Sequence, residues 1–497
     1  MKNTRVLIWS VPFCLSVSLL FGHLALSQPA SADREAPSEN PAEEFRNVAM
    51  GFPGNRIEAH IVAATISGGG RYGFPNRVYG DLGTIGGGVG NEAFSQATVA
   101  GGVRNTASGL RATIAGGEGN DATRDSATVG GGYGNRASAS HATISGGIAN
   151  VAAEIDATVG GGSGNTAAER HATVGGGSVN KAGGFASLIG GGIYNRASAT
   201  YSTVGGGIAN VSSAIESTVS GGAGNHASAE AAFVGGGMNN RATGLYATVA
   251  GGRANVAGNG KDFGADSAYA TVGGGRENTA GGRFSVVPGG WRNVADGNHS
   301  FAAGTGARVE PGHDGVFLYS DHNDREFHSE GPNEFAARAT GGVRFVTGID
   351  ASGRVLAGVR IAAGSGSWET LSDRHVKTAF SPVDGREILE RLRTVPILSW
   401  RYSAEHGVTR HIGPTAQDFH QAFQVGADER YISGVDADGV AMAAIQSLYD
   451  AVKERDRAIE AHEKRIRELE QEVAAQKRLM TEFETRLQGT KAGAKVN

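Results

Sequence analysis

The feature that most constrains this chain is an asparagine that returns every fifteen residues over a large part of its length. The spacing is fifteen from Asn105 to Asn255, Asn91 precedes this run by fourteen residues, and the pattern resumes after an eight-residue insertion. The recurring residues are Asn91, Asn105, Asn120, Asn135, Asn150, Asn165, Asn180, Asn195, Asn210, Asn225, Asn240, Asn255, Asn278 and Asn293. A period this regular predicts identical structural units stacked along one axis.

Each unit resembles Ala-Thr-Val-Gly-Gly-Gly-x-x-Asn, as in residues 172–180. The unit is too short for a pair of helices, and each glycine would weaken a helix by about 1 kcal/mol. Short strands and tight turns remain, with Val174 directed inward and Thr173 outward because strand side chains alternate. If each unit is one coil, the thirteen steps from Asn91 to Asn293 span roughly 60 Å. The asparagines then form a stacked structural ladder whose amides bond to the coils above and below.

Composition supports the same class of fold. The chain has 80 glycines among 497 residues but only 7% aromatic residues, which is too little bulk for several ordinary globular cores. The glycines also lack the every-third-residue period of collagen. We therefore predict a mainly β fold built as a solenoid. The net charge of −4 predicts no binding to nucleic acid and no general attraction to an anionic membrane.

Two ligand-binding interpretations of the glycines fail. Strings such as Gly175 to Gly177 resemble a phosphate-binding loop, but they recur in many units without a following helix or lysine. Residues 116–121 resemble a calcium-binding β-roll, which requires a nine-residue period and an aspartate that recurs. The residues equivalent to Asp121 in later units include Arg136 and Lys181. The sequence thus predicts no cofactor and no metal.

The N-terminus predicts export to the cell surface or the extracellular space. Lys2 and Arg5 precede a mostly apolar run that ends with small residues, so residues 1–27 have the pattern of a cleaved secretory signal. An uncleaved membrane anchor fits less well because polar residues interrupt the run. Cys14 is the only cysteine and lies within this signal, so the mature chain would have no disulfide. Removal of the signal would also leave the mature chain without a predicted membrane-spanning segment. Residues 28–56 are predicted to be a flexible linker.

The repeats resemble the heads of trimeric autotransporter adhesins over residues 57–308, including the closing stretch from Ser300 to Gly304. The resemblance implies a left-handed parallel β-roll in which three chains share one axis. The amphipathic strands of that family's outer-membrane anchor do not follow the C-terminal helical segment. Self-anchoring by that route is therefore not expected.

A second resemblance begins near Trp368, after a predicted β-rich neck over residues 309–371. The stretch Trp-Glu-Thr-Leu-Ser-Asp-Arg-His-Val-Lys, residues 368–377, resembles the start of the endosialidase-type chaperone and autoprotease domain of phage tail spikes. Further matches are Ile412-Gly413, Ala416-Gln417-Asp418 and Val435-Asp436. The resemblance implies a chaperone domain over residues 372–440 that assembles a trimer and then cleaves the bond between Leu371 and Ser372.

The residues at that bond are suited to the chemistry. A serine hydroxyl becomes a nucleophile when a base accepts its proton, and a lysine can be that base where burial lowers its pKa. Ser372 is the predicted nucleophile, Lys377 the base and Asp373 an orienting residue. Five residues turn about 140° around a helix, so a Ser372–Lys377 dyad requires a bend or a second chain. The enzymatic event would occur once per chain.

A purely structural interpretation uses the same residues. Ser372 would cap a helix that begins at Asp373, and Lys377 would be a solvated surface charge. His411 and His420 flank the glutamine motif and could assist proton transfer, although a structural role or an exposed position is more usual for histidine.

Residues 441–489 are predicted to form a coiled coil, followed by a tail over residues 490–497. One seam of the heptads contains Ile445, Val452, Ile459, Ile466, Val473, Met480 and Leu487, and the other contains Leu448, Leu469 and Phe483. The residue types at the seam favour a coiled coil of two helices, whereas both resemblances imply three. We therefore predict that the chain associates with two further copies as a homotrimer.

Three functions compete on this basis. The first is a self-processing structural fibre, and the second is a surface adhesin or receptor-binding module with a trimerisation domain that does not cleave. The third, hydrolysis of an external glycan or protein, lacks a recognisable group of carboxylates in the repeats. A cell-surface or glycan ligand is not identified. The insertion at Lys261, Asp262 and Phe263 is a weak candidate for recognition, and a tolerated surface loop is the simpler interpretation.

Overall fold

The computed structural model describes residues 46–259 and 265–493. They form two compact units, one ending at Arg338 and the other beginning at Ala339. Several sequence predictions lie outside the described residues: the signal peptide 1–27 with Cys14, the linker up to residue 45, the insertion residues Lys261, Asp262 and Phe263, and residues 494–497 of the tail.

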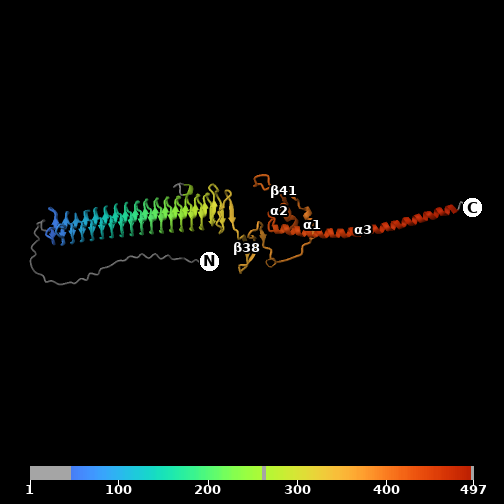
Figure 1. Cartoon of the computed structure of the whole chain (residues 1–497), viewed down its shortest axis with the longest axis horizontal. Helices are drawn as coiled ribbons and strands as arrows, with labels where there is room; N and C mark the ends of the chain where they lie inside the picture. The colour runs from blue at the N-terminus through green and yellow to red at the C-terminus, as the bar shows by residue number, and fades with distance from the viewer. Residues whose placement is uncertain (1–45, 260–264, 494–497) are drawn as a thin grey trace, which may run out of the picture. The chain divides into compact units, whose positions relative to one another are not determined.

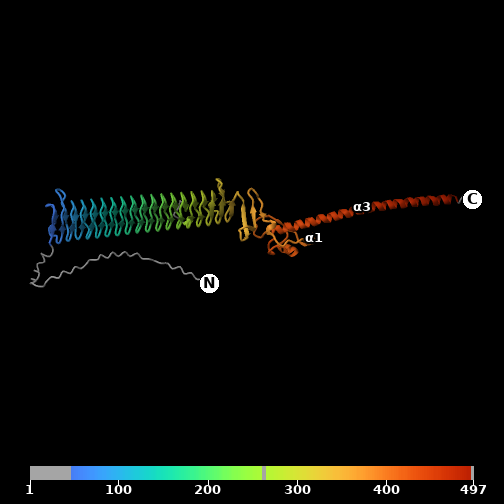
Figure 2. The ribbon, with the colours of Figure 1, turned by 90° about the horizontal axis from the view of Figure 1, so that it is seen from below.

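The first unit is a parallel β-solenoid, and the predicted mainly β repeat fold is confirmed (Figure 1, Figure 2). One side of every coil contributes a strand to a 19-stranded sheet, which we call sheet A. Its strands are β1 (Val48–Ala49), β3 (Thr65–Ile66), β5 (Thr84–Ile85), β7 (Thr98–Val99), β9 (Thr113–Ile114), β11 (Thr128–Val129), β13 (Thr143–Ile144), β15 (Thr158–Val159), β17 (Thr173–Val174), β19 (Leu188–Ile189), β21 (Thr203–Val204), β23 (Thr218–Val219), β25 (Phe233–Val234), β27 (Thr248–Val249), β29 (Thr271–Val272), β31 (Val286–Val287), β33 (Phe301–Gly304), β35 (Phe317–Ser320) and β37 (Phe335–Arg338).

A second side of the coils forms sheet B, whose strands also run parallel to one another. Its strands are β2 (Arg56–Ile57), β4 (Arg77–Val78), β6 (Glu92–Ala93), β8 (Thr106–Ala107), β10 (Asp121–Ala122), β12 (Arg136–Ala137), β14 (Val151–Ala152), β16 (Thr166–Ala167), β18 (Lys181–Ala182), β20 (Arg196–Ala197), β22 (Val211–Ser212), β24 (His226–Ala227), β26 (Arg241–Ala242), β28 (Val256–Ala257), β30 (Thr279–Ala280), β32 (Val294–Ala295), β34 (Ala307–Val309) and β36 (Phe327–His328). A short 3-10 turn, η1 (Ala265–Ser267), precedes β29.

The core of the solenoid is a thin layer between the two sheets. In β17, Val174 is fully buried and pairs in register with Ile189, whereas Thr173 is only half-buried and pairs with Leu188. The facing residue in sheet B is the small, fully buried Ala182. The predicted inward valine and outward threonine are confirmed. Burying one such valine contributes about 1.5–3 kcal/mol relative to leaving it exposed.

A row of single β-bridges forms a third side of the coils, just after the glycines. Ser178 bridges to Ile193 in this row, so one residue of each coil lies above its equivalent in the next. The glycine before the bridge is required by the stacking itself. Gly177 has φ +90°, and a Cβ there would collide with the carbonyl oxygen of Gly192 in the next coil. Only glycine satisfies both constraints.

The predicted asparagine ladder is present, with a more specific bonding pattern than expected. Asn180 is buried, and its Nδ2 donates to the carbonyl oxygens of Gly176 at 2.9 Å and Gly192 at 2.7 Å. Its Oδ1 accepts from the backbone N–H of Asn195 at 2.9 Å. Nδ2 of Asn180 also donates to Oδ1 of Asn165 in the preceding coil at 3.2 Å. The amide therefore bonds within its own coil and to the coils on both sides, as predicted.

The ladder is also longer than the sequence analysis indicated. The backbone N–H of Asn91 donates to Oδ1 of Asn76, and that of Asn76 donates to Oδ1 of Asn55, both at 2.9 Å. These two asparagines were missed because their flanking residues depart from the repeat and the step between them is longer than fifteen.

The solenoid extends beyond both predicted boundaries of the head. It begins with β1 at Val48, inside the stretch assigned to the linker, and continues through β37 to Arg338. The segment predicted as a neck therefore divides: residues 309–338 complete the solenoid, and residues 339–371 belong to the second unit. The final coils are longer than fifteen residues, as the register of their strands shows: Phe301 pairs with Phe317, and Phe317 pairs with Phe335.

Arg338 closes the C-terminal end of the solenoid. Its guanidinium lies 2.8 Å from the carboxylate of Asp321, and both side chains are only 17% exposed. It also donates to Oγ of Ser320 at 2.6 Å and to the carbonyl oxygen of Arg325 at 2.7 Å. These bonds satisfy polar groups that have no further coil to pair with.

The second unit begins with a three-stranded antiparallel sheet and contains three α-helices. The sheet has the order β38 (Val343–Ile349), β39 (Val355–Ile361) and β40 (Glu369–Thr370). The remaining elements are η2 (Arg374–Val376), α1 (Gly385–Thr394), the antiparallel pair β41 (Leu398–Trp400) and β42 (His411–Gly413), α2 (Ala416–Phe423) and α3 (Gly434–Gly493). The predicted coiled-coil segment forms one continuous helix that starts before residue 441.

The core of the second unit is small for its length. Its hydrophobic centre consists of Val395, Phe419, Phe423 and Val440, with α1 and α2 packed around the start of α3. Large apolar side chains elsewhere in this unit are exposed, including Ile412, Ile445 and Leu448. Exposed apolar surface on this scale marks an interaction surface rather than a finished single-chain fold.

Among the described residues, the model contains no helix that is both long and apolar enough to cross a membrane.

Candidate active site

The predicted cleavage site lies at the end of an edge strand. Strand β40 pairs with β39, with Thr370 opposite Val359, and the backbone N–H of Leu371 donates to the carbonyl oxygen of Gly358 at 3.1 Å. The chain is therefore fixed in an extended conformation up to the residue before Ser372. The sheet presents the Leu371–Ser372 bond at its border, where the strand ends.

A tight turn brings the predicted nucleophile and base together. Nζ of Lys377 donates to Oγ of Ser372 at 2.7 Å within one chain. The turn is η2 (Arg374–Val376), and its flanking residues Asp373 and Lys377 both have extended backbone angles. The bend removes the separation that a continuous helix would impose, so the two side chains meet without a second chain.

Asp373 has a different local role from the one predicted. It is the N-cap of η2, and its Oδ1 accepts from the backbone N–H of His375 at 2.9 Å. Nδ1 of His375 also lies 2.9 Å from this oxygen, and Nη2 of Arg354 lies 3.4 Å from Oδ2. The carboxylate thus shapes the turn that holds the dyad, and Asp373, not Ser372, is the cap.

The pKa of Asp373 is lowered by these contacts. The backbone N–H of His375 is the largest cause, its ring is the second, and the positive charge of Arg354 adds to them. Arg354 could not be found from the sequence, because it lies just before β39 and no motif links it to the predicted cleavage site.

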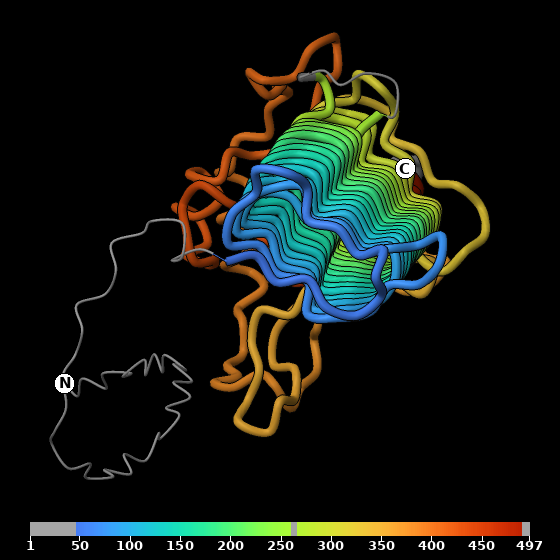
Figure 3. The backbone as a smooth tube through the Cα atoms, turned by 90° about the vertical axis from the view of Figure 1, so that its left-hand side faces the viewer, coloured from blue at the N-terminus to red at the C-terminus, as the bar shows by residue number. Residues whose placement is uncertain are grey.

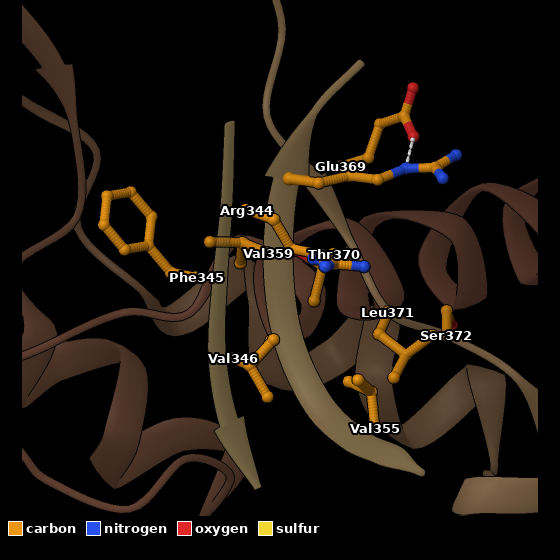
Figure 4. A pocket seen from close by; sticks show the side chains of 11 residues that line it. Arg344, Phe345, Val346, Val355, Val359, Glu369, Thr370, Leu371 and Ser372 are labelled. Carbon is orange, nitrogen blue, oxygen red and sulfur yellow. Dashed lines mark hydrogen bonds and ion pairs between the residues drawn. The ribbon is translucent and has the colours of Figure 1, made fainter. Parts of the chain in front are cut away.

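A cavity of about 350 Å³ adjoins the scissile residues (Figure 4). Its apolar wall comes from the faces of β38 and β39, and Leu371 contributes to it. Arg360 and Glu369 form an ion pair at 2.7 Å at its border. The lining side chains drawn in the figure include Arg344, Phe345, Val346, Val355, Val359, Thr370 and Ser372. An apolar cavity here can hold the side chain before the scissile bond in a fixed position.

The two histidines considered as proton carriers have structural partners. Nε2 of His411 lies 2.9 Å from the carboxylate of Glu405, and its ring stacks near Trp400. Nδ1 of His420 lies 3.1 Å from the carbonyl oxygen of Val425. Among the described residues, neither histidine forms a hydrogen bond or ion pair with Ser372 or Lys377, in keeping with the structural role considered more usual.

The remaining motifs build the small core. Thr415 caps α2, with its side chain accepting from the backbone N–H of Asp418 at 3.2 Å and donating to the Asp418 carboxylate at 2.7 Å. This cap fixes the start of a helix whose Phe419 and Phe423 are buried. The Ile412-Gly413 motif lies in β42, and Val435-Asp436 lies in the first turn of α3.

Comparison with known proteins agrees with the second resemblance. No curated protein matches the chain. A protein-family model described as chaperone of endosialidase matches residues 372–425. The match begins at Ser372 and ends after α2, before α3. Residues 372–425, which follow the long solenoid in the sequence, are therefore similar to the chaperone-of-endosialidase family.

Proposed function

We propose that this chain is an exported, trimeric fibre whose C-terminal domain assembles the trimer and then cleaves the bond between Leu371 and Ser372. The observation that carries the proposal is the 2.7 Å contact between Nζ of Lys377 and Oγ of Ser372, at the first residue of the matched chaperone domain. A serine paired with a lysine at the boundary of such a domain is suited to a single self-cleavage.

The proposed reaction balances with water as the only other reactant. Lys377, as the free amine, accepts the hydroxyl proton while Oγ of Ser372 attacks the carbonyl carbon of Leu371. The C–N bond breaks, the α-amine of Ser372 takes up the proton, and Leu371 is left as an ester on Oγ. Water then hydrolyses the ester, which releases the Leu371 carboxylate and restores the serine hydroxyl. No cofactor takes part.

Assembly of the trimer would supply the burial of Lys377 that the single chain lacks. Lys377 and Ser372 are exposed in one chain, whereas a general base must be the uncharged amine, which burial favours. The exposed heptad residues of α3, among them Ile445, Val452 and Ile459, are the surface on which three chains would associate. Packing of the chains would cover the dyad, so cleavage would follow correct assembly.

Mass spectrometry of the purified full chain tests the proposal. The wild type should yield two fragments, the second beginning at Ser372, whereas Ser372→Ala should remain uncut. Lys377→Ala and Lys377→Arg should both remain uncut, because arginine keeps the positive charge but cannot accept a proton. Arg374→Ala, which removes a neighbouring cation of the same turn, is the matched control and should cleave.

Cleavage in both Ser372→Ala and Lys377→Arg would eliminate the dyad. An uncut wild-type trimer would favour the second candidate, an adhesin or receptor-binding module that keeps its assembly domain without proteolysis. The long repetitive surface of the solenoid is the observation that favours this candidate, since repeat folds commonly provide extended binding surfaces.

A further inference from the structure

Each coil in the middle of the solenoid has two chemically different halves. The first half runs from the outward residue of the sheet A strand to the residue before the ladder asparagine. It contains no Asp, Glu, Lys, Arg or His in eight consecutive coils, at residues 128–134, 143–149, 158–164, 173–179, 188–194, 203–209, 218–224 and 233–239. The second half of each of these coils carries at least one Asp, Glu, Lys or Arg, as Lys181 and Arg196 illustrate. We call the surface of the first halves the charge-free face.

The charge-free face also exposes a row of large apolar side chains. Tyr133, Ile148, Ile193, Ile208 and Met238 belong to the row of β-bridges, so they follow one another along the axis. They are between 42% and 58% exposed. The end-on view shows that successive coils superimpose, so a row in the sequence is a straight row in space (Figure 3). Ser163, Ser178 and Ala223 occupy the intervening positions of the row, so the row carries no charge from Tyr133 to Met238. Exposed apolar side chains gathered along one uncharged row mark a surface that another protein covers.

Glycine occupies the middle of this face, and in most coils the single chain does not require it; four of the equivalents, Gly116, Gly131, Gly161 and Gly236, do have φ between +141° and +158°. A Cβ on Gly176 or on Gly191 would meet no atom within 4 Å, and neither residue has the left-handed backbone that favours glycine. The equivalent residue is glycine in all fourteen coils: Gly87, Gly101, Gly116, Gly131, Gly146, Gly161, Gly176, Gly191, Gly206, Gly221, Gly236, Gly251, Gly274 and Gly289. In the other ten coils the glycine has neither a left-handed φ nor a neighbour that a Cβ would strike, and close approach of another chain explains why it recurs there, as at the axis of collagen.

We propose that the charge-free face is the contact between copies of this chain in the fibre, with the row of Gly176 equivalents nearest the three-fold axis. This inference rests on the proposed trimer and adds the face through which the solenoids meet. Within each coil the glycine lies between an outward threonine such as Thr173 and the bridge residue such as Ser178. The apolar bridge row of one copy can therefore cover the threonine row of the next, on either side of the glycine.

A second copy fits this face better than an unrelated partner does. Its coils have the same spacing, so its rows match the rows of the first copy over the whole length without drift. Eight coils at about 4.8 Å, with seven residues of about 3.3 Å across, give an area on the order of 700–900 Å² per copy. Stable interfaces bury about 800 Å² per partner, so the face is large enough.

Cysteine cross-linking in the full chain tests this placement. In a Cys14→Ser background, which removes the only native cysteine, Gly176→Cys and Gly191→Cys each place a thiol in the glycine row. Lys181→Cys is the matched control, because it lies in the same coil as Gly176 but on the charged half. Far-UV circular dichroism checks that each variant folds, and light scattering gives the mass of the assembly.

After mild oxidation, the glycine-row variants should give disulfide-linked chains on a non-reducing gel, with at least about ten times the yield of Lys181→Cys, since a disulfide requires Cα atoms within roughly 7 Å. A trimer in which Lys181→Cys cross-links as well as Gly176→Cys would overturn the inference and leave the proposed function intact. A trimer without cross-linking at either glycine would do the same. A monomer by light scattering would overturn the proposed function, and the inference with it.

Discussion

Oδ1 of Asn180 accepts a hydrogen bond from the backbone N–H of Asn195, its equivalent in the next coil, at 2.9 Å. The same amide donates to Gly192 in the next coil, so one side chain makes two of the bonds that join adjacent coils. The ladder is therefore part of the backbone pairing of the solenoid.

Replacing Asn180 with leucine should destabilise the solenoid by about 3 kcal/mol, because the N–H of Asn195 and the carbonyl of Gly176 lose their partner at about 1–3 kcal/mol each. The carbonyl of Gly192 keeps its bond from the N–H of Ser178. Asn55→Leu is the matched control at the half-buried end of the ladder, where the loss should be smaller. Denaturant unfolding followed by circular dichroism measures both. Equal stability of Asn180→Leu and wild type would show that the ladder is not structural.

Asp373 should act on cleavage through the turn and not through its charge. Asn is as good a helix-type cap as Asp, so Asp373→Asn should cleave at a rate close to that of wild type, whereas Asp373→Ala should be slower by about tenfold. The rates are measured by following fragment appearance on a gel. Equal loss in Asp373→Asn and Asp373→Ala would instead assign a direct electrostatic role to the carboxylate.

The lowered pKa of Asp373 also fixes the sign of a pH effect. Its cap contributes stability above the ordinary aspartate pKa of about 4 and loses it as pH falls through the lowered value. Between pH 5 and 9 the contribution of the cap should thus be constant, measured as the difference in unfolding free energy between wild type and Asp373→Ala. A difference that grew as the pH fell below about 4 would contradict this sign.

Arg338 should stabilise the C-terminal end of the solenoid. Arg338→Ala removes a largely buried ion pair and three or more hydrogen bonds, and should cost about 2 kcal/mol. Arg344→Ala, an arginine beyond the solenoid, is the control. Hydrogen exchange should show faster opening of β35 and β37 in Arg338→Ala alone. Unchanged exchange would mean that the last coils are held by their stacked phenylalanines instead.

After removal of the chaperone, the stability of the fibre should depend on a slow rate of unfolding and not on an equilibrium with the unfolded chains. Three repetitive chains can pair out of register, and the proposed coiled coil of the C-terminal helices would raise the local concentration and align the chain ends. Cleaved wild-type fibre should therefore fail to refold after denaturation, whereas uncut Ser372→Ala should recover at least in part. Light scattering after matched dilution measures the trimer, and equal recovery would contradict the kinetic mechanism.

The sequence by itself determined the parts of the fold that depend on local repetition. Val174, Thr173 and Asn180 could be assigned to the core, the surface and the ladder, because every coil repeats the same alternation and each supplies independent evidence. The pairing of Ser372 with Lys377 was also predictable from the motif, and the family match begins at the same serine.

The tertiary structure decided what the repeat does not encode. The solenoid continues to Arg338 because the longer coils at its end keep their backbone register after the fifteen-residue period is lost. The direction of the asparagine bonds depends on which glycine carbonyl the next coil presents. Arg354 reaches Asp373 only because β39 and the turn after β40 lie side by side. These features depend on contacts between segments far apart in the sequence, which no local pattern specifies.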